Sequence, residues 1–208
     1  MTLLRRIRAT LCVVAGVALI AVYVLAGRQP ASVETRSEMA PGRSMAEGAR
    51  WQLLDEQGRP FVPDDLQGRP TVIVFGFTHC PDSCPTSLSY LAGVLQSLGP
   101  RGDAIQPLFL TVDPERDSVA VMADYTDLFD SRIRGVTGAP DQMAAALKGL
   151  GVYVRKVTQD GGYSMDHSAT ILLLDSRSRL RSTLAIHEGE EVAARKIEQL
   201  LVAEAGSH

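Results

Sequence analysis

Two cysteines, Cys80 and Cys84, are the residues of this sequence best suited to chemistry. They lie in residues 75–85 (FGFTHCPDSCP), between an apolar run and a stretch with helical periodicity. Cysteines four residues apart at a helix start lie on one face, one turn apart. The amides and dipole at a helix N-terminus favour thiolates there and lower their pKa. Two such thiolates suit Cu(I), and the same pair can close a disulfide, which as a purely structural bond would more usually join distant segments.

Asp113 and His167 are predicted to lie near this pair. Strands at 70–77 and 105–113 form a parallel βαβ arrangement, so their carboxyl ends meet at one sheet edge, where ligands bind. If the strand at 169–175 runs antiparallel to its neighbour, its start returns His167 to that edge. Two thiolates and an imidazole suit copper and lack the fourth ligand of a closed structural zinc site. From spacing alone, a capping or core histidine is the alternative for His167.

Alternating strands and helices must position these residues. The residues after 50 begin with a hairpin at 51–62, and a buried strand follows at 70–77. Helical patterns and further strands then alternate: helix 88–98, strand 105–113, helix 118–129, strand 132–136, helix 140–150, strands 152–158, 169–175 and 180–186, and helix 190–203. This order predicts an α/β, thioredoxin-like fold with a central mixed sheet flanked by helices and an N-terminal hairpin.

Three segments, FGFTHCPDSCPTSL, LTVDPERDS and GGYSMDHSATILLLD, resemble in sequence and order the motifs of the Sco (SenC) family of copper chaperones. The similarity covers about residues 50–186. It implies a membrane-tethered thioredoxin-like domain in which Cys80, Cys84 and His167 bind copper, as Cu(I) or Cu(II). It places the family's aspartate at Asp113, where it supports the site without binding the metal.

The resemblance also implies a task and partners. The task is delivery of copper to the binuclear copper centre of cytochrome c oxidase, or prior reduction of the cysteines of that centre. The implied partners are the copper-accepting oxidase subunit, other periplasmic copper donors and thiol reductants.

Three classes of function are compatible with the cysteine pair: a metallochaperone, a thiol–disulfide oxidoreductase, and a sensor or peroxidase. The C-x-x-x-C spacing argues against a general thioredoxin, as does Ser168-Ala169 where thioredoxins carry a proline. No Arg and Thr partner set for a peroxidase is identifiable. We therefore predict a metallochaperone, with the oxidoreductase as its competitor, and whether the protein is an enzyme stays open.

The N-terminus is predicted to anchor the chain in a membrane. Residues 9–27 carry no charge, follow three arginines and are long enough to come close to spanning a hydrocarbon core of roughly 30 Å. A cleaved signal peptide is the alternative, but a small-x-small cleavage site is lacking. We expect an anchor at 1–27, a flexible tether at 28–48 and a copper-binding domain at 49–208. The basic head predicts a single-pass protein of the inner membrane with its C-terminal domain in the periplasm or an equivalent exported space.

Composition limits the remaining functions. The chain has 208 residues, 45% of them hydrophobic, which suffices for one domain with a core. A net charge of −3 gives nucleic-acid binding no electrostatic basis. Other reactive side chains receive structural or unassigned roles: His79 (thiolate tuning or capping), Asp82 (first helical turn), Met165 (core or rim), Met39 and Met45 (weak candidates for transient copper binding), Cys12 (a small apolar residue of the anchor), His187 and His208 (no role identified).

Overall fold

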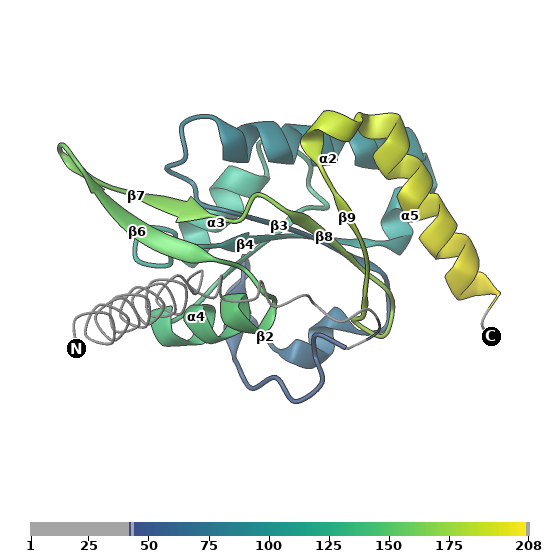
Figure 1. Cartoon of the computed structure of the whole chain (residues 1–208), viewed down its shortest axis with the longest axis horizontal. Helices are drawn as coiled ribbons and strands as arrows, with labels where there is room; N and C mark the ends of the chain where they lie inside the picture. The colour runs from purple at the N-terminus through teal and green to yellow at the C-terminus, as the bar shows by residue number, and fades with distance from the viewer. Residues whose placement is uncertain (1–41, 43, 207–208) are drawn as a thin grey trace, which may run out of the picture. The chain divides into compact units, whose positions relative to one another are not determined.

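A seven-stranded mixed sheet is the centre of the fold (Figure 1). The computed structural model describes Gly42 and residues 44–206, all within one compact unit. The strand order is β2-β1-β5-β4-β3-β8-β9. The strands are β1 (Leu53–Asp55), β2 (Pro60–Phe61), β3 (Thr71–Gly76), β4 (Gln106–Thr111), β5 (Arg134–Thr137), β8 (Ile171–Leu174) and β9 (Leu180–Leu184). The helices are α2 (Ser83–Leu98), α3 (Val119–Thr126), α4 (Pro140–Gly149) and α5 (Glu190–Ala205), with 3-10 turns η1 (Pro63–Leu66), η2 (Gly99–Ala104) and η3 (Ile186–Glu188).

The three central strands run parallel, and β8 runs antiparallel beside them. β4 pairs in parallel with both β3 and β5, whereas β3 pairs with β8 in the antiparallel direction. The predicted parallel βαβ unit and the predicted return of the strand at 169–175 are therefore confirmed. As a result, the carboxyl ends of β3 and β4 and the start of β8 lie at the same edge of the sheet.

Helices cover both faces of the sheet, which explains why all six residues of β3 are buried. Val72 and Val74 point into a cluster shared with α2 and α5. Ile73 and Phe75 point the other way, into a cluster that includes residues of α4. Figure 1 shows α2 and α5 on one side of the sheet and α4 on the other. This alternation divides the core into two apolar layers.

A β-hairpin outside the central sheet was only half predicted. Its strands, β6 (Val154–Gln159) and β7 (Gly162–His167), pair only with each other among the described residues, with Val154 opposite His167. The sequence predicted the first strand but not the second, because Gly, Ser and Asp are poor strand formers. The turn residues Gly161 and Gly162 have φ of 85° and 158°, which glycine adopts readily. The hairpin projects to one side of the body (Figure 1).

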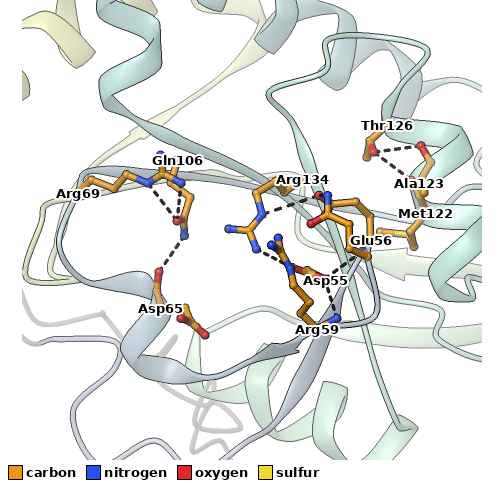
Figure 2. A network of polar contacts seen from close by, with 11 residues as sticks. Asp55, Glu56, Arg59, Asp65, Arg69, Gln106, Met122, Ala123, Thr126 and Arg134 are labelled. Carbon is orange, nitrogen blue, oxygen red and sulfur yellow. Dashed lines mark hydrogen bonds and ion pairs between the residues drawn. The ribbon is translucent and has the colours of Figure 1, made fainter.

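A polar network lies at the end of the sheet where β3, β4 and β5 begin, opposite the edge at which β3 and β4 end (Figure 2). Asp55 accepts two backbone hydrogen bonds within the β1–β2 turn, at 2.9 and 3.0 Å. It also accepts a bond of 2.8 Å from Arg59 and one of 3.0 Å from Arg134. Nearby, the Gln106 side chain donates to the carbonyl of Asp65, tying η1 to the start of β4. Four accepted bonds use the full capacity of the Asp55 carboxylate.

The end of the predicted tether packs on the folded domain. Ser44 forms an isolated bridge with Arg179, and the amide of Met45 donates to the carbonyl of Ser178 at 2.8 Å. Met45 and Ala46 are buried. Its position within the predicted tether, residues 28–48, suggested that Met45 is a free side chain of a flexible segment. In the structure Met45 is a core residue. Met39 lies outside the described residues.

The predicted anchor, residues 1–27, which include Cys12, also lies outside the described residues. Within the part of the chain that the structure describes, no helix has the length and apolar character needed to cross a membrane.

Candidate metal centre

Cys80 and Cys84 occupy the loop after β3 and the first turn of α2. Cys80 precedes the helix, and its amide donates to the carbonyl of Phe77 at 3.2 Å. The prediction that both cysteines share one helical face is therefore wrong, because the following Pro81 disfavours a helical backbone at Cys80. The two are nevertheless adjacent: the Cys84 amide donates to the Cys80 sulfur at 3.4 Å. Both thiols are free.

The two thiols have opposite electrostatic environments. Partial burial raises the pKa of Cys80. Hydrogen bonds from the Ser83 hydroxyl, the Asp82 backbone, and the side chain and backbone of Cys84 outweigh this rise, so the pKa of Cys80 is lowered. Burial raises the pKa of Cys84 to about 12, and the hydrogen bond to Cys80 adds to that rise. The expected lowering thus holds for Cys80 and fails for Cys84, which is 2% exposed. Cys80 is the thiol closer to ionisation, and Cys84 is a buried thiol.

His167 ends β7, and its ring faces Cys84. Its Nε2 atom lies 3.9 Å from the sulfur of Cys84. Its Nδ1 atom lies 2.9 Å from the Ser168 carbonyl, which can only accept, so Nδ1 carries the proton. The lone pair of Nε2 is therefore free to face the sulfur, the tautomer that metal-binding histidines commonly adopt. The ring also meets the Phe77 ring edge-on, with centroids 6.1 Å apart.

Gly76, the last residue of β3, lets the Cys84 sulfur approach the sheet. A Cβ atom at this position would lie 2.7 Å from the Cys84 sulfur and 2.8 Å from the Phe109 ring. Neither neighbour can retreat easily, because Cys84 and Phe109 are both buried. A residue without a side chain is therefore a requirement of this site.

Asp113 lies two residues beyond β4, at the same sheet edge, as predicted. Its carboxylate is buried and already engaged: Oδ1 accepts from the Tyr163 hydroxyl at 2.9 Å, and Oδ2 pairs with Nε of Arg116. Tyr163 belongs to β7, so Asp113 contacts the strand that carries His167. These contacts favour the supporting role that the sequence predicted over direct ligation.

Asp117 is a residue of the site that sequence reasoning missed. It is fully buried, and its carboxylate accepts from the Thr78 amide at 3.1 Å and from the Thr78 hydroxyl at 2.6 Å. A third bond comes from the hydroxyl of Thr111. Asp117 therefore fixes the loop that leads into Cys80. The available signal was the second aspartate of the segment LTVDPERDS.

The other candidates have local roles. His79 has an exposed side chain, with Nδ1 3.1 Å from the Thr78 hydroxyl. Met165 packs partly buried against the core, as predicted. Asp82 is the N-cap residue of α2, without a capping bond from its side chain, and is not inside the first turn. His187 is exposed in η3, and His208 lies outside the described residues.

In this arrangement, no three His, Cys, Asp or Glu side chains of the described residues are grouped so that they could hold a metal ion. The structure brings Cys84 and His167 together and places Cys80 next to Cys84. A three-ligand set of these residues therefore requires side-chain rotation in the cysteine loop, a motion that partly exposed side chains make readily.

Comparison with known proteins identifies the family. The SCO1/SenC family profile matches residues 40–202. The chain belongs to the SCO1/SenC family. Among curated relatives, the mitochondrial SCO2 homolog of Bos taurus is 40% identical over 167 residues, which cover 75% of this chain and 61% of the relative. The mitochondrial SCO2 protein of Saccharomyces cerevisiae is 33% identical over 188 residues, which cover 87% and 62%.

This SCO1/SenC chain spans about half to three fifths of the length of these and other curated relatives, such as the mitochondrial SCO2 homolog of Mus musculus. Solved structures agree on the fold. ScoI of Bradyrhizobium japonicum with copper bound has a TM-score of 0.68 and 40% identity, covering 72% of this chain and 96% of that one. Yeast Sco1 with copper bound has a TM-score of 0.66 and 35% identity, covering 73% and 86%. The thioredoxin-like α/β fold predicted from the sequence fits these structures, and homologous Sco proteins hold copper.

Proposed function

We propose that this chain is a membrane-anchored copper metallochaperone that binds copper through Cys80, Cys84 and His167. The observation that carries the proposal is the pairing of His167 with Cys84, because Nε2 faces the sulfur at 3.9 Å while Nδ1 is held by the Ser168 carbonyl. Thiolate sulfur suits Cu(I), and imidazole tolerates both oxidation states of copper. Copper-bound structures of two homologues support the choice of metal.

The asymmetry of the two thiols supports a role in transfer. Cys80 is partly exposed, so a donor or acceptor protein can reach it, whereas Cys84 is buried. Copper binding has to displace the proton of Cys84, whose pKa is about 12, and metal binding to thiols releases protons in general. An incoming thiolate or imidazole would displace Cys80 first and Cys84 last. Asp113 would support His167 through Tyr163.

The proposed acceptor is the copper-accepting subunit of cytochrome c oxidase, at its binuclear copper centre. Family membership supports this, as do the motifs at Cys80, Asp113 and His167. We further propose that residues 1–27 anchor the chain in the inner membrane and that the folded domain faces the periplasm or an equivalent exported space. The curated relatives are named as mitochondrial proteins.

The test is an anaerobic copper titration of the reduced full chain in mild detergent. We expect one tightly bound copper per chain and a visible thiolate-to-Cu(II) charge-transfer band. Cys80→Ser and Cys84→Ser should each weaken binding by about 100-fold or more, beyond the usual effect of losing a supporting group. His167→Ala should weaken binding less and shift the Cu(II) band.

His187→Ala is the matched control, because His187 is an exposed histidine of the same domain. Cys12→Ser controls for the third thiol. Wild-type affinity in both single cysteine variants of the motif would refute the proposed site.

A second candidate function is reduction of partner disulfides, favoured by a partly exposed Cys80 with a lowered pKa beside a buried Cys84. The Cys80 thiolate would attack a partner disulfide, releasing one partner thiolate and forming a mixed disulfide. The Cys84 sulfur would then attack Cys80, releasing the second thiolate after losing its own proton. Two electrons pass to the partner, and a Cys80–Cys84 disulfide remains. Fast exchange with a disulfide peptide, without tight copper binding, would favour this function over the first.

A further inference from the structure

The β6–β7 hairpin delivers His167 to the cysteines but shares no strand pairing with the central sheet among the described residues. Its position therefore depends on side-chain contacts. The loop between β4 and α3 supplies several of them: Asp113 bonds to the Tyr163 hydroxyl, and Glu115 pairs with Lys156. The Lys156 pair is exposed, and pairs of this kind contribute little.

Arg116, in the same loop, contacts both the hairpin and Phe77. Its guanidinium carbon lies 3.9 Å from the centre of the Tyr163 ring and 5.7 Å from that of the Phe77 ring. Its Nη1 donates to the Tyr163 carbonyl at 3.2 Å, and its Nε pairs with buried Asp113. A guanidinium beside two aromatic rings gains cation–π attraction, which strengthens as water is excluded. The side chain is 24% exposed.

Phe77 extends this contact to the metal site. Its ring meets the His167 ring edge-on, and its carbonyl accepts from the Cys80 amide. Arg116 thus touches one residue that adjoins the cysteine loop and one that lies on the histidine strand. Its Nη2 atom is buried and has no hydrogen-bond partner among the described residues, so packing against the rings, and not a complete set of hydrogen bonds, holds that end of the group.

We propose that Arg116 is a positioning residue for His167: by joining Phe77, Asp113 and Tyr163, it fixes the hairpin at the distance from Cys84 at which the imidazole can share a metal with the thiols. The part of this inference that concerns copper binding rests on the proposed function. The part that concerns the position of the hairpin rests on the contacts of Arg116 alone.

The first measurement is hydrogen exchange of the metal-free, reduced full chain. Arg116→Lys keeps the charge but loses the planar fork and its stacking. We expect exchange of the β7 amides to accelerate about tenfold, because local opening of the hairpin loses these contacts, while amides of β3 and α2 keep their wild-type rates. Tyr163→Phe keeps the ring and loses the bond to Asp113, so it should accelerate exchange a few-fold.

Arg155→Lys is the matched control. Arg155 lies on the same hairpin and pairs with Asp166, and both of these side chains are exposed. It should leave exchange at the wild-type rate. Unchanged β7 exchange in both Arg116→Lys and Tyr163→Phe, or an equal acceleration in β3 and α2, would overturn the proposal.

The second measurement is the Cu(II) charge-transfer band. Arg116→Lys should shift the band toward that of His167→Ala, and the double variant should bind copper no more weakly than His167→Ala alone, because both changes act through the same ligand. A wild-type band in Arg116→Lys would overturn the positioning role. If His167→Ala itself binds copper as the wild type does, the proposed function fails, while the exchange rates still decide whether Arg116 holds the hairpin.

Discussion

Two polar groups at opposite ends of the central sheet, the Asp55 carboxylate and the Cys84 sulfur, differ in how fully they are paired. Where β3, β4 and β5 begin, Asp55 accepts four hydrogen bonds, including bonds from two arginines (Figure 2). Where β3 and β4 end, the one polar side chain from outside the cysteine loop that contacts the Cys84 sulfur, among the described residues, is His167, at 3.9 Å. A carboxylate whose acceptor positions are all used stabilises the fold and has no free lone pair for a ligand. Donor atoms that have free lone pairs and are held in place by their neighbours are available to a ligand.

Removing the Asp55 carboxylate should have the largest effect on stability. Asp55→Ala should lower the free energy of unfolding by about 3 kcal/mol, because it leaves Arg134 and two turn amides without their acceptor. Copper affinity of the folded protein should not change, since Asp55 lies at the opposite end of the sheet. Chemical denaturation and copper titration of the same variant measure both quantities. A loss of copper affinity at unchanged stability would contradict the separation of the two ends.

The same carboxylate predicts an acid dependence. Burial raises the pKa of Asp55, but hydrogen bonds from Arg59 outweigh it, so the folded-state pKa lies below the ordinary value of an aspartate. The stability that Asp55 contributes is fully present above the pKa of an aspartate in the unfolded chain and is lost as the pH falls through the lower folded-state pKa. Asp55→Ala should lack this part of the acid transition.

Next to Cys84, Gly76→Ala should cost about 1–3 kcal/mol of stability, because the added methyl group meets buried Cys84 and Phe109. It should also weaken copper binding, since the sulfur of Cys84 has to move. Gly149→Ala is the matched control: this glycine ends α4, and a Cβ there would meet nothing within 4 Å. Equal copper affinities of the Gly76 and Gly149 variants would show that the close approach of Cys84 is not required.

The smallest expected effect concerns the difference in reactivity between the two cysteines. In the reduced, metal-free chain, iodoacetamide should modify Cys80 at least about tenfold faster than Cys84, because only the thiolate reacts and Cys84 is a buried thiol. The rate at Cys80 should rise with pH and reach half its maximum below the ordinary thiol pKa. Mass spectrometry of peptides follows both sites in a Cys12→Ser background. Faster modification of Cys84 would reverse their assigned roles.

Apart from β7, the strands could be predicted from the sequence, as could the meeting of Cys84 with His167, because apolar runs identify buried strands and sheet geometry brings their ends together. β7 could not, since GYSMDH becomes a strand only by pairing with β6. Arg116, Asp117 and Tyr163 were also missed. Each has a partner tens of residues away, as in the bond between Asp117 and Thr78, 39 residues apart, and no local pattern reports such contacts.

The raised pKa of Cys84 was missed for a related reason. The helix N-terminus was visible in the sequence and predicted a lowered pKa, but the burial that dominates depends on how α2 packs against β3. Pro81 was visible too, and its effect on the residue before it could have placed Cys80 outside the helix.

The separate hairpin has a consequence for the order of folding. β6 and β7 pair residues that are close in sequence, and such hairpins form in about 1–10 μs. The imidazole of His167 meets a sulfur 83 residues earlier in the chain, and it does so beside β8, whose pairing with β3 closes a still longer loop. Contacts of this separation form late. We therefore expect the thiol and the imidazole to meet late in folding, after the hairpin itself has formed and once β8 has paired with β3.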